Sequence, residues 1–199
     1  MSISAAMVKE LRDKTNSGMM DCKKALAECD GDMTKAVDWL RQKGLAVAAK
    51  RGDRQASEGQ IMSYIHAGGK LGVLVEVNCE TDFTGKTEEI SLFAKDVAMQ
   101  VAAANPVCIS PEDLPAEVVQ REKDIYIAQA KDSGKPEKIW DKIIEGKLKK
   151  FESESCLLKQ AFVKDPDKTI ADLQTEMTAK IGEKIAIRRF ACFRLGEEG

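Results

Sequence analysis

The sequence predicts an α+β fold, in which an N-terminal three-helix module precedes a core with a small antiparallel sheet, flanking helices and a helical hairpin. Three short segments before residue 45 carry apolar residues at helical spacing. Two runs rich in Ile, Val, Leu and Tyr then flank a glycine-containing turn, which predicts a β-hairpin. Farther along, two helical segments separated by a Gly-Lys-Pro break predict antiparallel helices joined by a tight turn.

The three-helix module is expected over residues 1–45. Val8 and Leu11 mark its first helix, which ends at the turn formers Thr15-Asn16-Ser17-Gly18. The next two helices share the apolar spacing i, i+3, i+4, i+7, with Cys22, Ala25, Leu26 and Cys29 in one and Met33, Ala36, Val37 and Leu40 in the other. Gly44 is the expected C-terminal cap. So small a module is typical of a docking unit carried by a larger body.

A linker is expected at residues 46–58, where an alanine-rich helical tail of the third helix gives way to charged and glycine-containing sequence. The core then spans residues 59–199. Gln60–His66 and Leu71–Asn78 are its first two strands, on either side of Ala67-Gly68-Gly69-Lys70. These runs predict two antiparallel strands.

The helices of the core follow the hairpin. One apolar face, made of Ile90, Phe93, Ala94, Val97, Ala98 and Val101, predicts a helix that stops before Asn105-Pro106. Ser110-Pro111-Glu112-Asp113 then has the features of a helix start: a capping side chain, an early proline and acids facing the helix dipole. It predicts a helical hairpin over about 111–150, with its break at Ser133-Gly134-Lys135-Pro136.

The last third of the chain predicts one helix and one strand. The helix runs from about Thr169 to Lys180 and is closed by Gly182. The strand, at about 185–195, carries Phe190, Cys192 and Phe193 between arginines. We expect it to add a third strand to the earlier hairpin.

The charge balance argues against a nucleic-acid partner. The 199 residues include 31 Lys and Arg and 33 Asp and Glu, a formal net charge of -2, without the basic excess of nucleic-acid-binding proteins. The N-terminus has no export signal, and the apolar stretches fall short of the roughly 20 residues that a membrane span needs. We therefore expect a cytoplasmic protein with no direct contact to nucleic acid or membrane.

The residues that could perform chemistry predict a binding protein rather than an enzyme. The chain lacks phosphate-loop and dinucleotide motifs, and its six cysteines include no C-x-x-C pair, so we expect reduced thiols and no cofactor or metal. An enzyme would have to combine the single histidine, His66, with Cys22, Cys79 or Cys192. For His66, beside the glycine turn, a structural or partner-contact role is the simpler interpretation.

Two sequence features suggest partner contacts. Phe83 is a bulky aromatic among polar residues after a strand; it either folds back as a core plug or protrudes as an aromatic anchor for binding. Met19 and Met20 are adjacent on a helix, so both cannot face its core, and at least one is a candidate contact residue. Packing at the helix start is the alternative for these methionines.

Three motifs carry a family resemblance. Val8-Lys9-Glu10-Leu11-Arg12, followed by Gly18-Met19-Met20-Asp21-Cys22-Lys23-Lys24-Ala25-Leu26, resembles the N-terminal signature of the elongation factor Ts family. Val75-Glu76-Val77-Asn78-Cys79-Glu80-Thr81-Asp82-Phe83 is similar to its second signature, and Gly182-Glu183-Lys184-Ile185-Ala186-Ile187-Arg188-Arg189-Phe190 to its C-terminal strand. The resemblance spans nearly the whole chain. Thr84-Gly85 departs from the family's Val-Ala, which predicts a more polar and flexible loop.

The resemblance implies a guanine-nucleotide exchange factor for elongation factor Tu. Phe83 of the Thr81-Asp82-Phe83 loop would wedge between two helices of the GTPase domain, with Asp82 in polar contact beside it, and so disturb the Mg²⁺ and phosphate sites that hold GDP. Met19, Met20 and Lys23 would touch the GTPase domain near the nucleotide pocket, while the body and the helical hairpin grip another face. Short members of the family are expected to form homodimers.

A non-catalytic interaction module remains the alternative function. Three-helix units of this size also occur in ubiquitin-associated (UBA-like) domains. Such a module would not need the loop of Thr81, Asp82 and Phe83.

Overall fold

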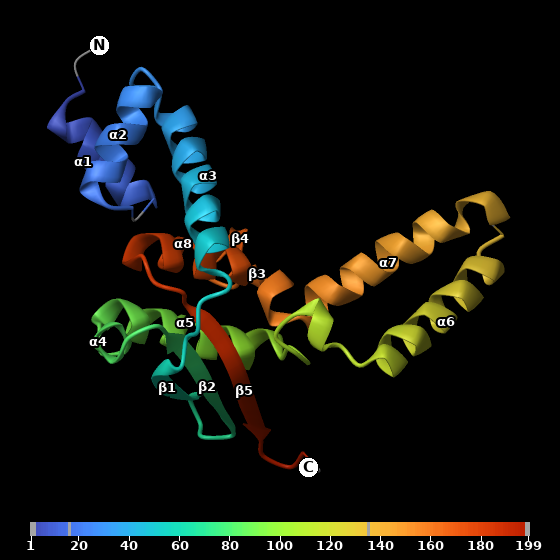
Figure 1. The fold of residues 1–199 in the computed structure, drawn as a ribbon. Helices are drawn as coiled ribbons and strands as arrows, with labels where there is room; N and C mark the ends of the chain where they lie inside the picture. The colour runs from blue at the N-terminus through green and yellow to red at the C-terminus, as the bar shows by residue number, and fades with distance from the viewer. Residues whose placement is uncertain (1–2, 16, 135, 198–199) are drawn as a thin grey trace. The chain divides into compact units, whose positions relative to one another are not determined.

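The computed structural model describes residues 3–15, 17–134 and 136–197 and has the α+β fold that the sequence predicts (Figure 1). Its contacts divide the chain into two compact units. The first unit comprises Met1–Ile61, Glu76–Ala94 and Asp172–Ile187, and the second comprises Met62–Val75, Lys95–Ala171 and Arg188–Gly199. The division into module, linker and core stays a prediction.

The N-terminal helices confirm the apolar pattern. They are α1 (Ala5–Thr15), α2 (Met19–Glu28) and α3 (Met33–Arg51). Their shared core consists of Val8, Leu11, Cys22, Ala25, Leu26, Ala36 and Leu40. Asp32 caps α3 by accepting the Lys35 N–H at 3.1 Å. Asn16 of the predicted first turn lies outside the described residues.

Gly44 does not end the third helix, so its prediction as a C-terminal cap is wrong. Helix α3 continues through Gly44 to Arg51, as the predicted helical tail requires. Gly44 is buried, and a Cβ at this position would lie 3.4 Å from the Cβ of Ala179 on α8 (Ile170–Ile181). The glycine permits a close approach between two helices rather than a turn.

The sheet consists of β1 (Glu58–Ile65), β2 (Leu71–Cys79) and β5 (Ala186–Arg194), in the order β1-β2-β5. This confirms both the hairpin and the added strand. The His66 N–H donates to the Leu71 carbonyl at 2.9 Å and closes the hairpin turn. Alternate side chains of β2, namely Val73, Val75, Val77 and Cys79, are buried, as expected for a strand with one face on the core.

The amphipathic helix after the sheet is α5 (Glu88–Ala104), preceded by the single-turn helix α4 (Asp82–Gly85). All six predicted face residues of α5, from Ile90 to Val101, are buried. The helix ends at Ala104, before Asn105 with φ 45° and Pro106, as predicted.

The helical hairpin starts later than the sequence predicts. Ser110 and Asp113 form a capping box, but on a short 3-10 turn, η1 (Pro111–Asp113). Helix α6 (Ala116–Asp132) begins only after Pro115, because a proline drives the preceding residue out of the helical region; Leu114 has ψ 126°.

The second arm of the hairpin is α7 (Trp140–Ser155), which follows the 3-10 turn η2 (Glu137–Ile139). Helices α6 and α7 pack side by side (Figure 1). Lys135 of the predicted break lies outside the described residues.

A small two-stranded antiparallel sheet, β3 (Ala161–Phe162) and β4 (Asp165–Thr169), was not predicted; it follows the 3-10 turn η3 (Leu157–Lys159). Fully buried Gln100 supports it by donating to the Ala161 carbonyl at 3.1 Å and accepting the Val163 N–H at 2.9 Å. Within the described ranges, no helix is both long and apolar enough to cross a membrane.

Candidate functional site

Phe83 protrudes from the first unit with 84% of its surface exposed. It lies on α4, where the next two residues, Thr84 and Gly85, are buried. Because neighbouring residues of a helical turn point in different directions, burial of Thr84 and Gly85 leaves the phenyl ring in solvent. The interpretation of Phe83 as a core plug is therefore wrong, and the ring is free to contact a partner.

Thr81 begins the turn that carries Phe83. Its hydroxyl oxygen accepts the Thr84 N–H at 3.3 Å and caps α4. Its carbonyl accepts a hydrogen bond from the buried Cys79 thiol at 3.1 Å. Thr81 is thus a structural part of the loop; it is also exposed, and its role as a partner contact stays a prediction.

Glu183, just before β5, holds the same turn through three hydrogen bonds. Its Oε2 accepts the Thr81 N–H at 3.1 Å, and its Oε1 accepts the hydroxyl groups of Thr81 and Thr84, each at 2.8 Å. Desolvation raises the pKa of Glu183, but the hydrogen bonds from Thr84 and Thr81 outweigh it, so the pKa lies below its ordinary value and the carboxylate stays charged.

Glu80, the residue before Thr81, forms a second anchor of the loop. Its carboxylate accepts the Lys184 N–H at 2.7 Å and lies 3.1 Å from the Nη1 atoms of Arg51 and Arg54. The Lys184 hydrogen bond is the main cause that lowers the pKa of Glu80, and the two guanidinium groups lower it further against desolvation. With only 14% of its side chain exposed, Glu80 ties the end of α3 to the end of β2.

Sequence reasoning did not single out Glu80 or Glu183. Both stand within motifs that resemble the family, but neither interrupts an apolar period or completes a catalytic pattern. The backbone N–H groups that they bind, those of Thr81 and Lys184, lie about 100 positions away in the chain, and one sequence gives no signal for such a pairing.

Two glycines allow the turn to pack against β1. A Cβ on Gly85 would lie 3.0 Å from the Cα of Gly59, and Gly59 has φ 136°, a backbone conformation that favours glycine. Gly85 and Thr84 are buried, and Thr84 is hydrogen-bonded to Glu183. These contacts contradict the expectation that Thr84-Gly85 makes the loop more flexible.

Asp82 lies beside Phe83 and is open to solvent. Its Oδ2 lies 2.5 Å from the Lys86 ammonium, and 63% of its side chain is exposed. The hydrogen bond to Asp82 raises the pKa of Lys86. An exposed phenyl ring and an exposed carboxylate therefore stand next to each other on one turn.

The predicted contact residues of the N-terminal module lie on α2. Met19 is 50% exposed, Met20 is 75% exposed, and Lys23 is exposed. This confirms that at least one of the methionines faces solvent. They belong to the first unit, as Phe83 does.

His66 belongs to the second unit, where it is exposed and its Nδ1 lies 3.0 Å from the Tyr64 hydroxyl oxygen. Cys22 and Cys79, two of its candidate partners in an enzyme, belong to the first unit and are fully buried. Burial raises the pKa of both thiols, which favours their protonated, unreactive form. Among the residues described, no group of three or more His, Cys, Asp or Glu side chains could hold a metal ion.

Comparison with known proteins identifies the family. The model of the family described as "Elongation factor TS" matches residues 15–197. The elongation factor Ts of Syntrophobacter fumaroxidans is 64% identical over 198 residues, which cover 100% of this chain and 99% of the relative. Those of Desulfosudis oleivorans and Desulfotalea psychrophila are 61% and 62% identical over 196 residues, which cover 98% of this chain and 99% and 100% of the relatives. The chain belongs to the elongation factor Ts family and is a translation elongation factor.

Proposed function

We propose that the chain is a guanine-nucleotide exchange factor for elongation factor Tu and catalyses no bond chemistry of its own. It binds the GTPase, inserts the Phe83 ring between helices of the GTPase domain, disturbs the Mg²⁺ and phosphate sites and releases GDP. The observation that carries the proposal is the exposure of Phe83, 84%, on a turn whose other residues are buried or hydrogen-bonded.

The free energy of burying the Phe83 ring is large enough to accelerate GDP release. Burial of a phenylalanine side chain contributes about 1.5–3 kcal/mol, and about 1.4 kcal/mol changes a rate tenfold. Insertion of Phe83 can therefore accelerate GDP release by about 10- to 100-fold. Because the turn is already ordered before binding, little of this free energy is lost in ordering it.

Thermodynamic linkage relates the binding of GDP to the binding of the exchange factor. If the factor weakens GDP binding by some ratio, GDP weakens binding of the factor by the same ratio. The ternary complex of GTPase, GDP and factor then loses either ligand readily. The factor therefore promotes nucleotide exchange only if its wedge weakens GDP binding. Tight binding of the factor alone would not be enough.

Other exposed residues supply binding free energy. Met19 and Met20 are flexible apolar contacts for the GTPase domain, Lys23 adds a charge beside them, and Asp82 adds a polar contact beside the ring. We assign His66 and the α6–α7 hairpin to contacts elsewhere on the partner.

The proposed domain organisation is a docking module at 1–45, a linker at 46–58 and a core at 59–199.

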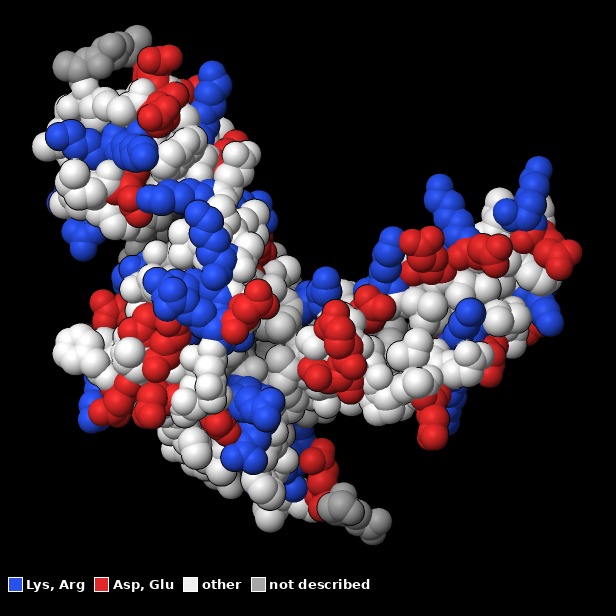
Figure 2. All heavy atoms as spheres, viewed as in Figure 1, with Lys and Arg blue, Asp and Glu red and all other residues white. Residues whose placement is uncertain are grey.

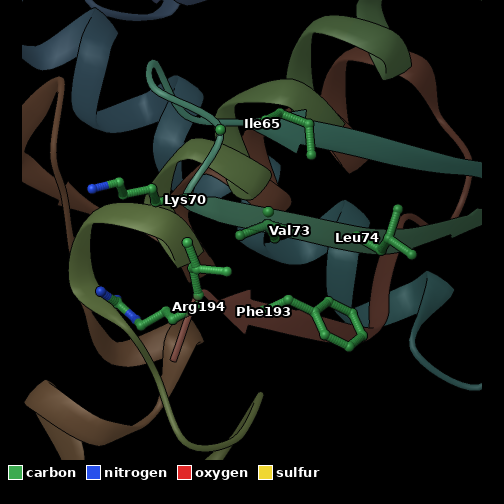
Figure 3. Close-up of a pocket in the computed structure, with 9 residues that line it drawn as sticks. Ile65, Lys70, Val73, Leu74, Phe193 and Arg194 are labelled. Atoms are coloured by element: carbon green, nitrogen blue, oxygen red, sulfur yellow. The ribbon is translucent and has the colours of Figure 1, made fainter. Parts of the chain in front are cut away.

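We also propose a homodimer that forms through the outer face of the sheet in the second unit. Figure 3 shows Ile65, Leu74 and Phe193 on three neighbouring strands around one pocket, and all three are exposed, Phe193 by 66%. The outer face of a one-sided antiparallel sheet is normally polar, and an exposed apolar patch marks an interface. Two copies of one apolar face are complementary by symmetry.

The charges at the rim of this face are compatible with such pairing. Arg194 lies 3.5 Å from Glu197 of the same chain, so its charge is balanced before a second copy arrives. Across the face of the molecule visible in Figure 2, Lys and Arg interleave with Asp and Glu. This mixed charge supports a protein partner rather than nucleic acid. We place the protein in the cytoplasm, because translation elongation takes place there.

The test is release of fluorescent GDP from elongation factor Tu, followed by stopped flow. Phe83→Ala should slow stimulated release by about 10- to 100-fold, because the wedge is lost, while urea unfolding stays unchanged, because the ring is exposed. Val107→Ala removes apolar surface from another exposed position and should leave release at the wild-type rate.

Two outcomes would reject the exchange proposal in different ways. A Phe83→Ala protein that releases GDP as fast as the wild type removes Phe83 from the mechanism. A wild-type protein that binds the GTPase without accelerating release supports the alternative of a UBA-like interaction module.

A further inference from the structure

We propose that Glu183 and Glu80 are positioning residues that hold Phe83 in the orientation needed for nucleotide release. This inference rests on the proposed exchange function. The two glutamates form what we call the glutamate clamp, defined as Glu80 and Glu183 with the backbone N–H groups of Thr81 and Lys184.

The clamp is reciprocal. The Glu183 carboxylate accepts the N–H of Thr81, the residue after Glu80, at 3.1 Å. The Glu80 carboxylate accepts the N–H of Lys184, the residue after Glu183, at 2.7 Å. Each of the two chain segments therefore supplies both an anionic acceptor and a backbone donor to the other. Shifting one segment along the other would break both bonds at once.

The second oxygen of Glu183 extends the clamp into α4. Its Oε1 accepts the Thr81 and Thr84 hydroxyl groups, each at 2.8 Å, on the two sides of Phe83 in the sequence. A hydrogen bond to a charged acceptor is stronger than one between neutral groups. Thr84 is hydrogen-bonded to Glu183 and buried, and in this orientation of the single turn of α4 Phe83 faces solvent.

Arg51, the last residue of α3, and Arg54, just after the helix, complete the arrangement. Arg51 Nη1 lies 3.1 Å from both oxygens of Glu80, and Arg54 Nη1 lies 3.1 Å from one of them. These guanidinium groups balance the charge of Glu80 beside a second carboxylate. They also tie the clamp to the last helix of the N-terminal module.

The clamp matters for exchange because a wedge must be ordered before it binds. A phenyl ring on a turn that samples several orientations pays an ordering cost at the moment of insertion, which weakens binding and slows release. In Glu183→Gln the side-chain oxygen can still accept the hydroxyl groups, but its NH₂ group faces the Thr81 N–H, so one donor is left unpaired.

The experiment is a double-mutant cycle in the GDP-release assay, with the full-length protein. Glu183→Gln and, separately, Thr84→Val should each lower stimulated release by about two- to tenfold, the effect of one lost hydrogen bond. In a Phe83→Ala background neither change should reduce release further, because the clamp acts through the ring. Glu89→Gln, an exposed glutamate of the same unit, should leave release unchanged.

Hydrogen exchange of backbone amides gives a readout that does not depend on the GTPase. Exchange at Thr81 and Thr84 should be faster in Glu183→Gln than in the wild type, while amides in the core of α5 remain equally protected. The proposal is wrong if Phe83→Ala slows release but Glu183→Gln changes neither release nor exchange at Thr81. It is also wrong if Glu183→Gln has the same effect with and without Phe83.

Failure of the proposed function would look different. In that case Phe83→Ala would release GDP at the wild-type rate, whatever the effect of the clamp variants on amide exchange. The amide data would then still tell whether Glu183 orders the turn.

Discussion

Gly59 makes the closest backbone approach beside the Phe83 turn. It adopts φ 136°, and a Cβ at this position would overlap the Val77 carbonyl oxygen and lie 2.8 Å from the Cα of Asn78. Neither strand can move away without losing its pairing in the sheet. At the residue scale, the site is therefore held by positions that tolerate only glycine.

Gly59→Ala should destabilise the protein by at least about 2 kcal/mol, because it adds both a strained φ and a steric overlap. Gly146→Ala is the matched control. Gly146 lies inside α7 with open space around its Cα, so alanine should stabilise the fold by about 0.5–1 kcal/mol. Urea unfolding of both variants measures the difference, and equal midpoints would contradict it.

Single residues also show how far the sequence predicts the site. The Thr81-Asp82-Phe83 motif pointed to the loop, but the direction of Phe83 stayed open, because exposure depends on what Thr84 and Gly85 contact. Glu183 could not be found, since nothing around it in the chain reveals a partner 102 positions away.

At the scale of elements, the end of β2 and the start of β5 are joined by two carboxylates as well as by the sheet. The pKa of Glu80 and of Glu183 lies below the ordinary value of 4.5. A carboxylate whose pKa is lowered by folding stabilises the native state above its unfolded pKa, and this stabilisation is lost as the pH falls through the folded pKa.

The stability of the wild type should therefore fall as the pH drops below about 4.5. Glu183→Gln lacks one of the two groups, so its free energy of unfolding should depend less on pH in this range. Urea unfolding at about pH 6 and about pH 3.5 gives the comparison. If wild type and variant lost the same free energy between these two conditions, Glu183 would not contribute to the acid sensitivity.

The sequence predicted well the elements that have a strong apolar periodicity. It did not predict the elements whose position depends on a few individual residues. All six residues of the predicted apolar face of α5 are buried. A helix with one continuous apolar face packs on the core with that face. The start of α6 was misplaced because Ser110 to Asp113 caps a 3-10 turn and Pro115 prevents its extension. The pair β3–β4 was missed, since strand β3 has only two residues and no pattern.

On the scale of the whole molecule, the sheet has an apolar outer face. The proposed contacts of the N-terminal helices and of the Phe83 turn with the GTPase do not use this face. Ile65, Leu74 and Phe193 line one pocket in the second unit (Figure 3). Exposed apolar groups of this kind favour association, and association stabilises the folded state by mass action.

The melting temperature should therefore rise with protein concentration, and sedimentation should give a dimer. Phe193→Asp should yield a monomer whose melting temperature no longer depends on concentration, because a charge cannot be buried unpaired in the apolar face. Val163→Asp places the same charge at an exposed apolar position outside the pocket and should remain dimeric. A wild type that sediments as a monomer at every concentration would rule the dimer out.

The distance along the chain between the two halves of the glutamate clamp has a consequence for synthesis. A chain that emerges from its N-terminus exposes Thr81 and Phe83 long before Glu183 is made. Until then the Thr84 hydroxyl lacks its Glu183 acceptor, and under the proposed clamp the Phe83 ring is not yet held in its orientation. If Phe83 acts as the proposed wedge, a nascent or prematurely terminated chain would carry the ring without Glu183, and only a nearly finished molecule would promote exchange.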